Sequence, residues 1–219
     1  MALRFWLVPA VLLSWSAMAQ SGQETAPIVR PGAPGASSTT LSPANVGSAP
    51  REPFEADTKF MQGMIMHHSQ AVEMTDMMRT RTHNKELLAL GKRISISQTD
   101  EMKFMKQWLE ERGKPTTMQH DMSHMSHAEH MNMSMQMMMP GMLTPEQMKA
   151  LGKANGPAFD HLFLTGMIQH HTGALTMVTD LFNTAGAGQD SQLFDFATDV
   201  DNTQRAEINI MQGMLKGKK

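Results

Sequence analysis

The chain has 219 residues and a formal net charge of −2, a size that fits one or two modest domains. So small a charge excludes the strongly basic surface that nucleic-acid-binding proteins use, so no nucleic-acid partner is expected. The sequence has 25 methionines and ten histidines but no cysteine. Disulfides, thiolate metal sites and cysteine nucleophiles are therefore excluded, and any soft-metal site must use thioethers and imidazoles.

Residues 1–19 have the pattern of a signal peptide. Arg4 precedes an apolar run, and the segment ends with Ala17 and Ala19 around one larger residue, which is the small-x-small cleavage pattern. We expect cleavage before Gln20 and export to the periplasm. The alternative is an uncleaved anchor, but the run of about fourteen apolar residues is shorter than the ~20 that span a bilayer. No later stretch comes closer, so no membrane span is expected after cleavage.

Residues 20–53 are rich in Pro, Gly, Ser, Ala and Thr and show no apolar period, which predicts a disordered linker. Residues 54–115 are predicted to form a helical hairpin, because buried-type side chains recur there every three or four residues. Its second helix is expected to begin after Asn84 and to end before Gly113 and Pro115.

Residues 116–143 interrupt the helical pattern. Between 116 and 142, fourteen of twenty-seven residues are Met or His, with no amphipathic order. We expect this Met/His segment to be a crossover between two hairpins. Residues 144–216 are predicted to form a short helix, which Thr144 caps with Gln147 as its capping-box partner, and then a second hairpin.

The second hairpin repeats the first. Residues 160–177 are identical to residues 57–74 at nine of eighteen positions, and the partner helices match at an offset of 106 residues. One hairpin alone would leave its apolar face in water. The sequence therefore predicts an all-α fold, a four-helix bundle in which the two hairpins pack together.

The repeat carries a Gly-Met-Ile-x-His-His motif with soft-metal donors. On a helix, Met64 lies one turn before His67 and His68, so a thioether and an imidazole can meet one ion. Four histidines at matching places would leave polar rings in an apolar core unless an ion or a partner satisfies them. Adjacent histidines point about 100° apart, so the spacing does not decide which of each pair faces the bundle. The predicted bundle ligands are Met64, His67, His68, Met74, Met167, His170, His171 and Met177.

Polar residues of the partner helices offer an alternative role for these histidines. A hydrogen-bonded network with Gln98, Glu101, Gln204 and Glu207 would also satisfy the rings. The two glutamates could accept the free ring N–H of a ligating histidine and fix its tautomer, or could lie at the wet edge of the bundle. Asp57 and Asp160 are expected to interact with helix dipoles rather than with metal.

The crossover supplies a second set of candidate ligands. Thioethers are soft and uncharged and favour Cu(I) or Ag(I), and the interleaved imidazoles extend the range to Cu(II). Sites that use histidine should weaken as the pH falls through about 6.5, whereas thioether-only sites should not. A methionine-rich tract can also serve as an adaptable binding surface. The predicted crossover ligands are Met118, His120, Met122, His124, Met125, His127, His130, Met131, Met133 and Met135.

Three parts of the chain resemble the family called domain of unknown function 305: the stretch FMQGMIMHHSQAVEM, the stretch TPEQMKALGKANGPAFDHLFLTGMIQHHTGALTM, and the Gln-x-x-Glu partner helices. The resemblance runs from Phe54 to about Leu215 apart from the crossover. It implies a ferritin-like fold. Because the CopM-type periplasmic members bind copper or silver through Met and His, it also implies a copper role for the bundle ligands.

These features predict a non-enzymatic periplasmic protein that binds Cu(I), with Cu(II) and Ag(I) as further cargo, for copper sequestration, resistance or delivery to other copper-handling proteins. Two alternatives remain: a ferritin-like metallo-oxidase that oxidises Cu(I), and a protein-interaction module with structural histidines. The di-iron oxidase pattern needs Glu-x-x-His on two helices, and the sequence contains no Glu-x-x-His. It also lacks hydrolase and transferase signatures.

Overall fold

The computed structural model describes residues 28–30, 39–41, 52–118 and 138–217, in two units that divide after residue 49. The predicted signal peptide lies outside these residues. In the first unit, strands β1 (Ile28–Arg30) and β2 (Thr39–Leu41) pair antiparallel, with Ile28 opposite Leu41. Both strands lie within the predicted linker, at β-branched residues that favour extended backbone. The rest of that linker lies outside the described residues.

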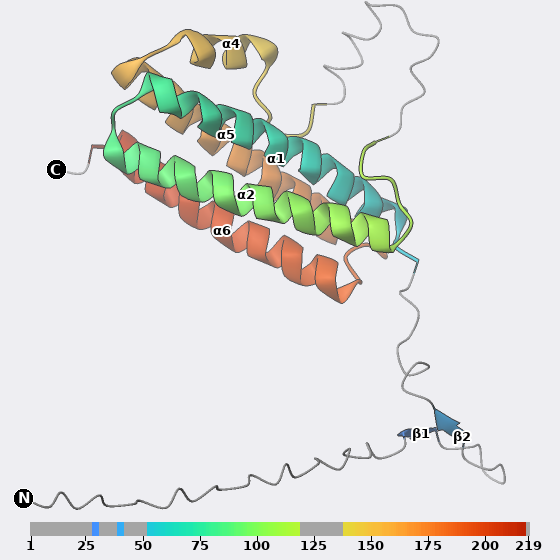
Figure 1. Ribbon diagram of the computed structural model, residues 1–219. Coiled ribbons are helices and arrows are strands. Elements are labelled where there is room, and N and C mark those ends of the chain that lie inside the picture. Colours follow the sequence, from blue (N-terminus) through green and yellow to red (C-terminus); the bar gives the residue numbers. More distant parts are fainter. Residues whose placement is uncertain (1–27, 31–38, 42–51, 119–137, 218–219) are drawn as a thin grey trace, which may run out of the picture. The chain divides into compact units, whose positions relative to one another are not determined.

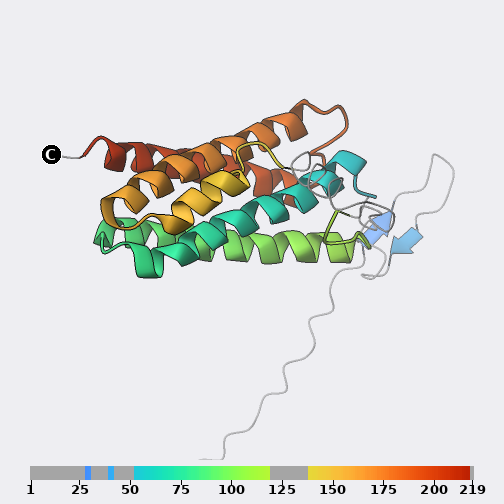
Figure 2. The same ribbon diagram turned by 90° about the horizontal axis from the view of Figure 1, so that it is seen from above.

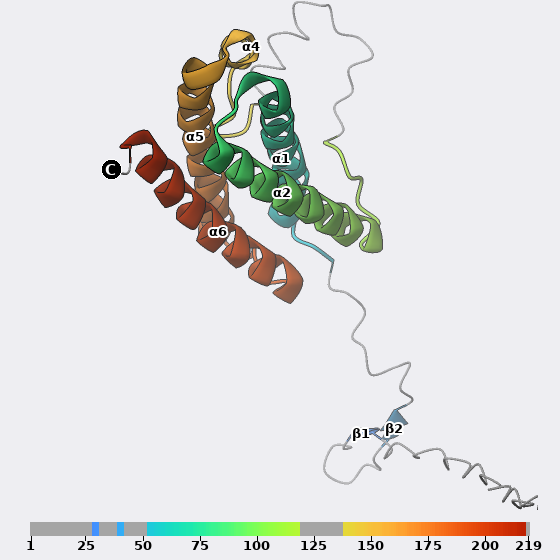
Figure 3. The same cartoon turned by 60° about the vertical axis from the view of Figure 1, so that its left-hand side comes forward.

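The second unit is a bundle of four long helices, made of two antiparallel hairpins. Helix α1 (Glu55–Arg81) pairs with α2 (Lys85–Glu111), and α5 (Gly156–Asn183) pairs with α6 (Ser191–Leu215). Figure 3 shows these two pairs side by side, and α1 packs against α5 where they meet. The prediction of an all-α four-helix bundle built from two repeated hairpins is confirmed.

The helix ends follow the predicted capping chemistry. The Asn84 side chain accepts the Leu87 N–H at 3.2 Å at the start of α2, and the chain turns after this helix at Gly113, whose φ is +63°. The short helix α4 (Pro145–Lys153) has the full capping box between Thr144 and Gln147. It contacts α1 and α5 and lies beside them in Figures 1 and 2.

Helices α1 and α5 run in opposite directions (Figure 2). They approach closely at two glycines. A Cβ placed on Gly63 would lie 3.4 Å from the Met177 methyl carbon. A Cβ placed on Gly166 would lie 3.4 Å from the Met74 methyl carbon. Because these pairs are equivalent in the repeat, the two contacts relate the hairpins by an approximate twofold symmetry.

The buried apolar side chains of the bundle form two clusters, one toward each end. The first contains Met64 and Met177, and the second contains Met74 and Met167. Between them, at mid-length of all four helices, lies a layer of buried or half-buried polar side chains. This polar layer consists of His67, His68, Gln98, Glu101, His170, His171, Gln204 and Glu207.

Both described ends of the crossover are bonded to α1. Gln62 Nε2 donates to the Pro115 carbonyl oxygen at 2.7 Å. Gln70 exchanges two hydrogen bonds with the Leu143 backbone, donating at 2.9 Å and accepting at 2.7 Å. Among the described residues, no helix is long and apolar enough to cross a membrane.

Candidate metal centre

The central pair of the polar layer is His67 and His170, one from each hairpin. Their ring centroids lie 3.7 Å apart with the ring planes tilted by 36°, and both rings are fully buried. His67 Nε2 bonds to the Pro140 carbonyl oxygen at 3.0 Å, and His170 Nε2 bonds to the His67 carbonyl oxygen at 2.8 Å. The returning end of the crossover therefore covers His67 directly.

Burial keeps this central pair uncharged. Desolvation, with the nearby His68 ring as the next cause, lowers the pKa of His67 from 6.5 to about 3, although the bond to Pro140 opposes the shift. Desolvation and the neighbouring His67 ring likewise hold the pKa of His170 well below its usual value. At neutral pH both rings are neutral and each has one lone pair that can bind a metal ion.

The outer pair, His68 and His171, is held by one carboxylate each. His68 Nε2 donates to Glu101 on α2 at 2.6 Å, and His171 Nε2 donates to Glu207 on α6 at 2.6 Å. Burial alone would raise the pKa of Glu101, but hydrogen bonds from His68 and Ser97 outweigh it and the pKa is lowered. The prediction that these glutamates accept ring N–H groups is confirmed, and both histidines of each pair are buried.

All four histidines use Nε2 for a hydrogen bond to an oxygen acceptor, so we place a proton on each Nε2. Each Nδ1 is buried and has no hydrogen-bond partner among the described residues. The side-chain amides of Gln98 and Gln204 are buried without a partner in the same way. Buried polar atoms without a partner destabilise a protein core. The unpartnered Nδ1 atoms of this layer are electron-pair donors that could bind a metal ion.

The predicted thioether ligands of the bundle lie in the two apolar clusters on either side of the polar layer. Met64 of the first hairpin shares a cluster with Met177 of the second, and Met74 shares the other cluster with Met167. Thioethers from both hairpins therefore border the histidines at each end. Within the described residues, no three His, Asp or Glu side chains form a group that could hold a metal ion. An ion in this layer would need a further donor, and the thioethers of the two clusters are the soft ones.

Most of the predicted crossover ligands lie outside the described residues: His120, Met122, His124, Met125, His127, His130, Met131, Met133 and Met135. Met118 is described, and its methyl carbon would lie 3.2 Å from a Cβ on Gly63. Met139, which the sequence did not single out, reaches the same point, with its sulfur 3.0 Å from that Cβ. Composition placed Met139 in a methionine-rich tract, but no spacing rule distinguished it from its neighbours.

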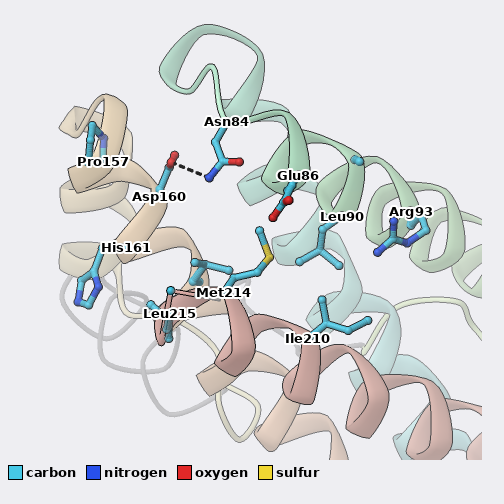
Figure 4. A pocket seen from close by; sticks show the side chains of 13 residues that line it. Asn84, Glu86, Leu90, Arg93, Pro157, Asp160, His161, Ile210, Met214 and Leu215 are labelled. Carbon is cyan, nitrogen blue, oxygen red and sulfur yellow. Dashed lines mark hydrogen bonds between the residues drawn. The ribbon is translucent and has the colours of Figure 1, made fainter. Parts of the chain in front are cut away.

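The two aspartates of the repeat play structural roles. Asp57 Oδ1 accepts the Gly188 N–H at 2.8 Å, which ties α1 to the α5–α6 turn. Asp160 accepts from Asn84 at 3.2 Å and lines a hollow of about 730 Å³ at the other end of the bundle (Figure 4). Figure 4 shows His161 and Met214 in this hollow, but none of the predicted ligands lines it.

Comparison with known proteins relates this architecture to solved structures. A DUF305 protein from Streptomyces coelicolor, described as secreted, is 31% identical with a TM-score of 0.58 and covers 74% of this chain and 92% of its own. A DUF305 fragment from Deinococcus radiodurans is 26% identical, with a TM-score of 0.60 and coverage of 75% and 97%. CopM in its Cu(II)-bound form is 27% identical, with a TM-score of 0.55 and coverage of 73% and 95%.

CopM has also been solved in a Cu(I)-bound form, which has the same fold as this chain with a TM-score of 0.54. No significant match is found among curated proteins. The sequence profile described as "Domain of unknown function (DUF305)" matches residues 57–215, which is most of the bundle. The chain therefore belongs to the DUF305 family.

Proposed function

We propose that this protein binds copper, as Cu(I), between thioether and imidazole donors in the polar layer of the bundle, and that it acts as a copper carrier or store rather than an enzyme. The observation that carries the proposal is the set of buried Nδ1 atoms on His67, His68, His170 and His171 that have no hydrogen-bond partner among the described residues. CopM, a protein of similar fold, has been solved with copper bound.

The donors favour a soft monovalent ion over Zn²⁺ or Mg²⁺. The described residues contain no group of three His, Asp or Glu side chains that could hold a metal ion, whereas buried thioethers lie in the clusters on both sides of the layer. A single charge also costs less to bury than a double one. The partly buried carboxylates of Glu101 and Glu207 offset that charge. Ag(I) has the same ligand preferences, and the imidazoles allow Cu(II).

Each glutamate also orients its histidine. A carboxylate that accepts the Nε2–H of His68 or His171 fixes the tautomer and makes Nδ1 a stronger donor. The carbonyl oxygens of Pro140 and His67 do the same for the central pair without adding charge. The ligands are therefore preorganised before the ion arrives.

The Met/His segment would provide a second group of metal-binding sites. Its composition supports capture of Cu(I), Ag(I) or Cu(II) at exchangeable sites, and its two ends are bonded to α1 beside the polar layer. We propose that it collects ions and passes them to the bundle. The signal-peptide pattern at residues 1–19 supports action in the periplasm, where other copper-handling proteins would be partners.

The proposal is tested by anaerobic Cu(I) titration against a chromophoric chelator. The polar layer is changed in His67→Gln and His170→Gln, and the Met/His segment is shortened by deleting residues 119–137. His161→Gln, at an exposed histidine outside the layer, is the matched control. We expect the layer variants to lose the tightest site and the deletion to lower the stoichiometry, with the control unchanged and every fold verified by circular dichroism.

Unchanged Cu(I) affinity in both layer variants would overturn the proposed site. The same samples in air test the non-enzymatic assignment through oxygen consumption. Catalytic turnover of Cu(I) that the layer variants abolish would identify an oxidase instead.

A further inference from the structure

Three thioethers from three parts of the chain meet over Gly63, at the seam between α1 and α5. A Cβ on this glycine would lie 3.0 Å from Met139 Sδ, 3.2 Å from the Met118 methyl carbon and 3.4 Å from the Met177 methyl carbon. Met118 and Met139 belong to opposite ends of the crossover, whereas Met177 belongs to α5. The missing side chain of Gly63 leaves a notch into which all three thioethers project.

Hydrogen bonds hold both crossover ends at this notch. Gln62, the neighbour of Gly63, donates to the carbonyl oxygen of Pro115, three residues before Met118. On the other side, the carbonyl oxygen of Pro140, directly after Met139, bonds to His67. The two methionines are therefore positioned by backbone contacts that do not involve their sulfur atoms.

The repeat contains an internal comparison for this notch. Gly166 is the equivalent of Gly63 in the second hairpin, and Met74 is the equivalent of Met177. Over Gly166 the space beside the Met74 methyl carbon is filled by Leu143, whose two methyl carbons would lie 2.9 and 3.6 Å from a Cβ there. One leucine thus closes this notch with hydrocarbon. Packing alone does not require the two extra thioethers at Gly63.

The Gly63 notch is also reachable from solvent. Met118, Met139 and Met177 line a surface hollow of about 290 Å³, which also contains Asp180 and Lys59. Met177 itself is 8% exposed, and the other two methionines are half-buried. Soft donors at the wall of an open hollow are accessible to an incoming ion, whereas the imidazoles of the polar layer are fully buried.

The geometry points to a three-thioether site for a soft monovalent ion, Cu(I) or Ag(I), formed by Met118, Met139 and Met177 over Gly63. This inference rests on the proposed copper-binding function and adds to it a distinct entry site one helical turn from His67. Three neutral sulfur donors suit Cu(I) and exclude the harder divalent ions. The site would accept the ion at the surface before it reaches the polar layer.

The test follows the methionine methyl groups of the full chain by NMR after labelling with ¹³C-methyl methionine. Cu(I) is diamagnetic, so each methyl resonance can be tracked during an anaerobic titration, with total Cu(I) uptake measured on the same samples. We expect the resonances of Met118, Met139 and Met177 to shift together at one common metal ratio. Met139→Leu keeps the packing volume and should reduce the affinity reported by Met177 at least tenfold.

Met148→Leu, at a partly buried methionine that packs against the second apolar cluster, is the matched control and should leave the Met118, Met139 and Met177 shifts unchanged. The inference is overturned if these three resonances do not shift, or shift at different ratios of Cu(I) to protein, while the protein takes up Cu(I). That outcome leaves the polar-layer proposal intact. If the protein takes up no Cu(I) at all, the proposed function and this site both fail.

Discussion

The rings of His67 and His170 contact each other with their centroids 3.7 Å apart and their planes tilted by 36°, although they lie in different hairpins. Both rings are fully buried, and the loss of contact with water disfavours the charged imidazolium form of each. The pair therefore stays neutral, which leaves its Nδ1 atoms free to bind an ion and makes the fold sensitive to acid.

The metal-free protein is expected to lose stability as the pH falls below 6.5. The unfolded chain binds a proton on His67 near pH 6.5, but the folded chain resists protonation down to about pH 3. Because the unfolded state then binds more protons, the free energy of unfolding falls by up to about 1.4 kcal/mol per histidine and pH unit. Denaturant unfolding at pH 7, 6 and 5 measures this slope.

His67→Gln should make the dependence of the unfolding free energy on pH shallower, because it removes one histidine whose pKa is lowered in the folded state. His161→Gln, at an exposed position, should keep the slope of the unmodified protein. Equal stability of the unmodified protein from pH 7 to pH 5 would show that the histidine pair is not held neutral by burial.

Replacing both layer glutamates should weaken copper binding without removing a ligand. In Glu101→Gln combined with Glu207→Gln, His68 and His171 lose their charged acceptors, so their Nδ1 atoms become weaker donors and the ion loses its counter-charge. Loss of such an orienting partner typically lowers metal affinity by roughly 10- to 100-fold. Chelator competition measures it, with exposed Glu110→Gln as the control. An unchanged affinity would show that the two glutamates do not contribute to metal binding.

Gly173 permits the backbone of the crossover to cross α5. A Cβ there would lie 1.9 Å from the Pro140 carbonyl oxygen and 2.5 Å from Gly141 Cα, and these are backbone atoms that cannot rotate away. Gly173→Ala should therefore destabilise the fold by about 1–3 kcal/mol. Gly152→Ala, whose nearest contact is 4.0 Å away, should be neutral or stabilising by up to about 1 kcal/mol. Thermal unfolding of the two variants should rank them in this order.

Gly63→Ala should affect binding rather than stability. Alanine favours a helix interior by about 1 kcal/mol over glycine, and the closest obstacle is the end of the flexible Met139 side chain, at 3.0 Å. The fold should tolerate the change, but the new methyl group occupies the notch. We expect Cu(I) affinity at the thioether site to fall while the melting temperature is maintained. A large fall in the melting temperature would mean that the notch is needed for packing.

The duplication made the architecture predictable. Two copies of one amphipathic hairpin have few ways to bury their apolar faces, so the bundle and the placement of His67, His68, His170 and His171 at one level followed from the repeat. The caps at Asn84 and Thr144 were predictable for a local reason, because a side-chain oxygen satisfies N–H groups only a few residues away.

The arrangement of the thioethers could not be predicted in the same way. Helical spacing relates Met64 to His67 on one helix, but it does not show that packing between the hairpins brings Met64 and Met177 into one cluster. The convergence of Met118 and Met139 depends on where a crossover without periodicity returns to the bundle. That position is set by long-range contacts, such as Gln70 with Leu143, which no local pattern reveals.

The most direct measurement is ¹⁵N NMR of the histidine side chains in the full chain, without and with Cu(I). In the metal-free spectrum, all four rings should be protonated at Nε2, and the buried rings of His67 and His170 should be neutral. On Cu(I) addition, we predict that Nδ1 resonances of the polar layer shift as ligands while Nε2 stays protonated. Copper uptake without any change at these Nδ1 atoms would contradict the account and assign the metal to other parts of the chain.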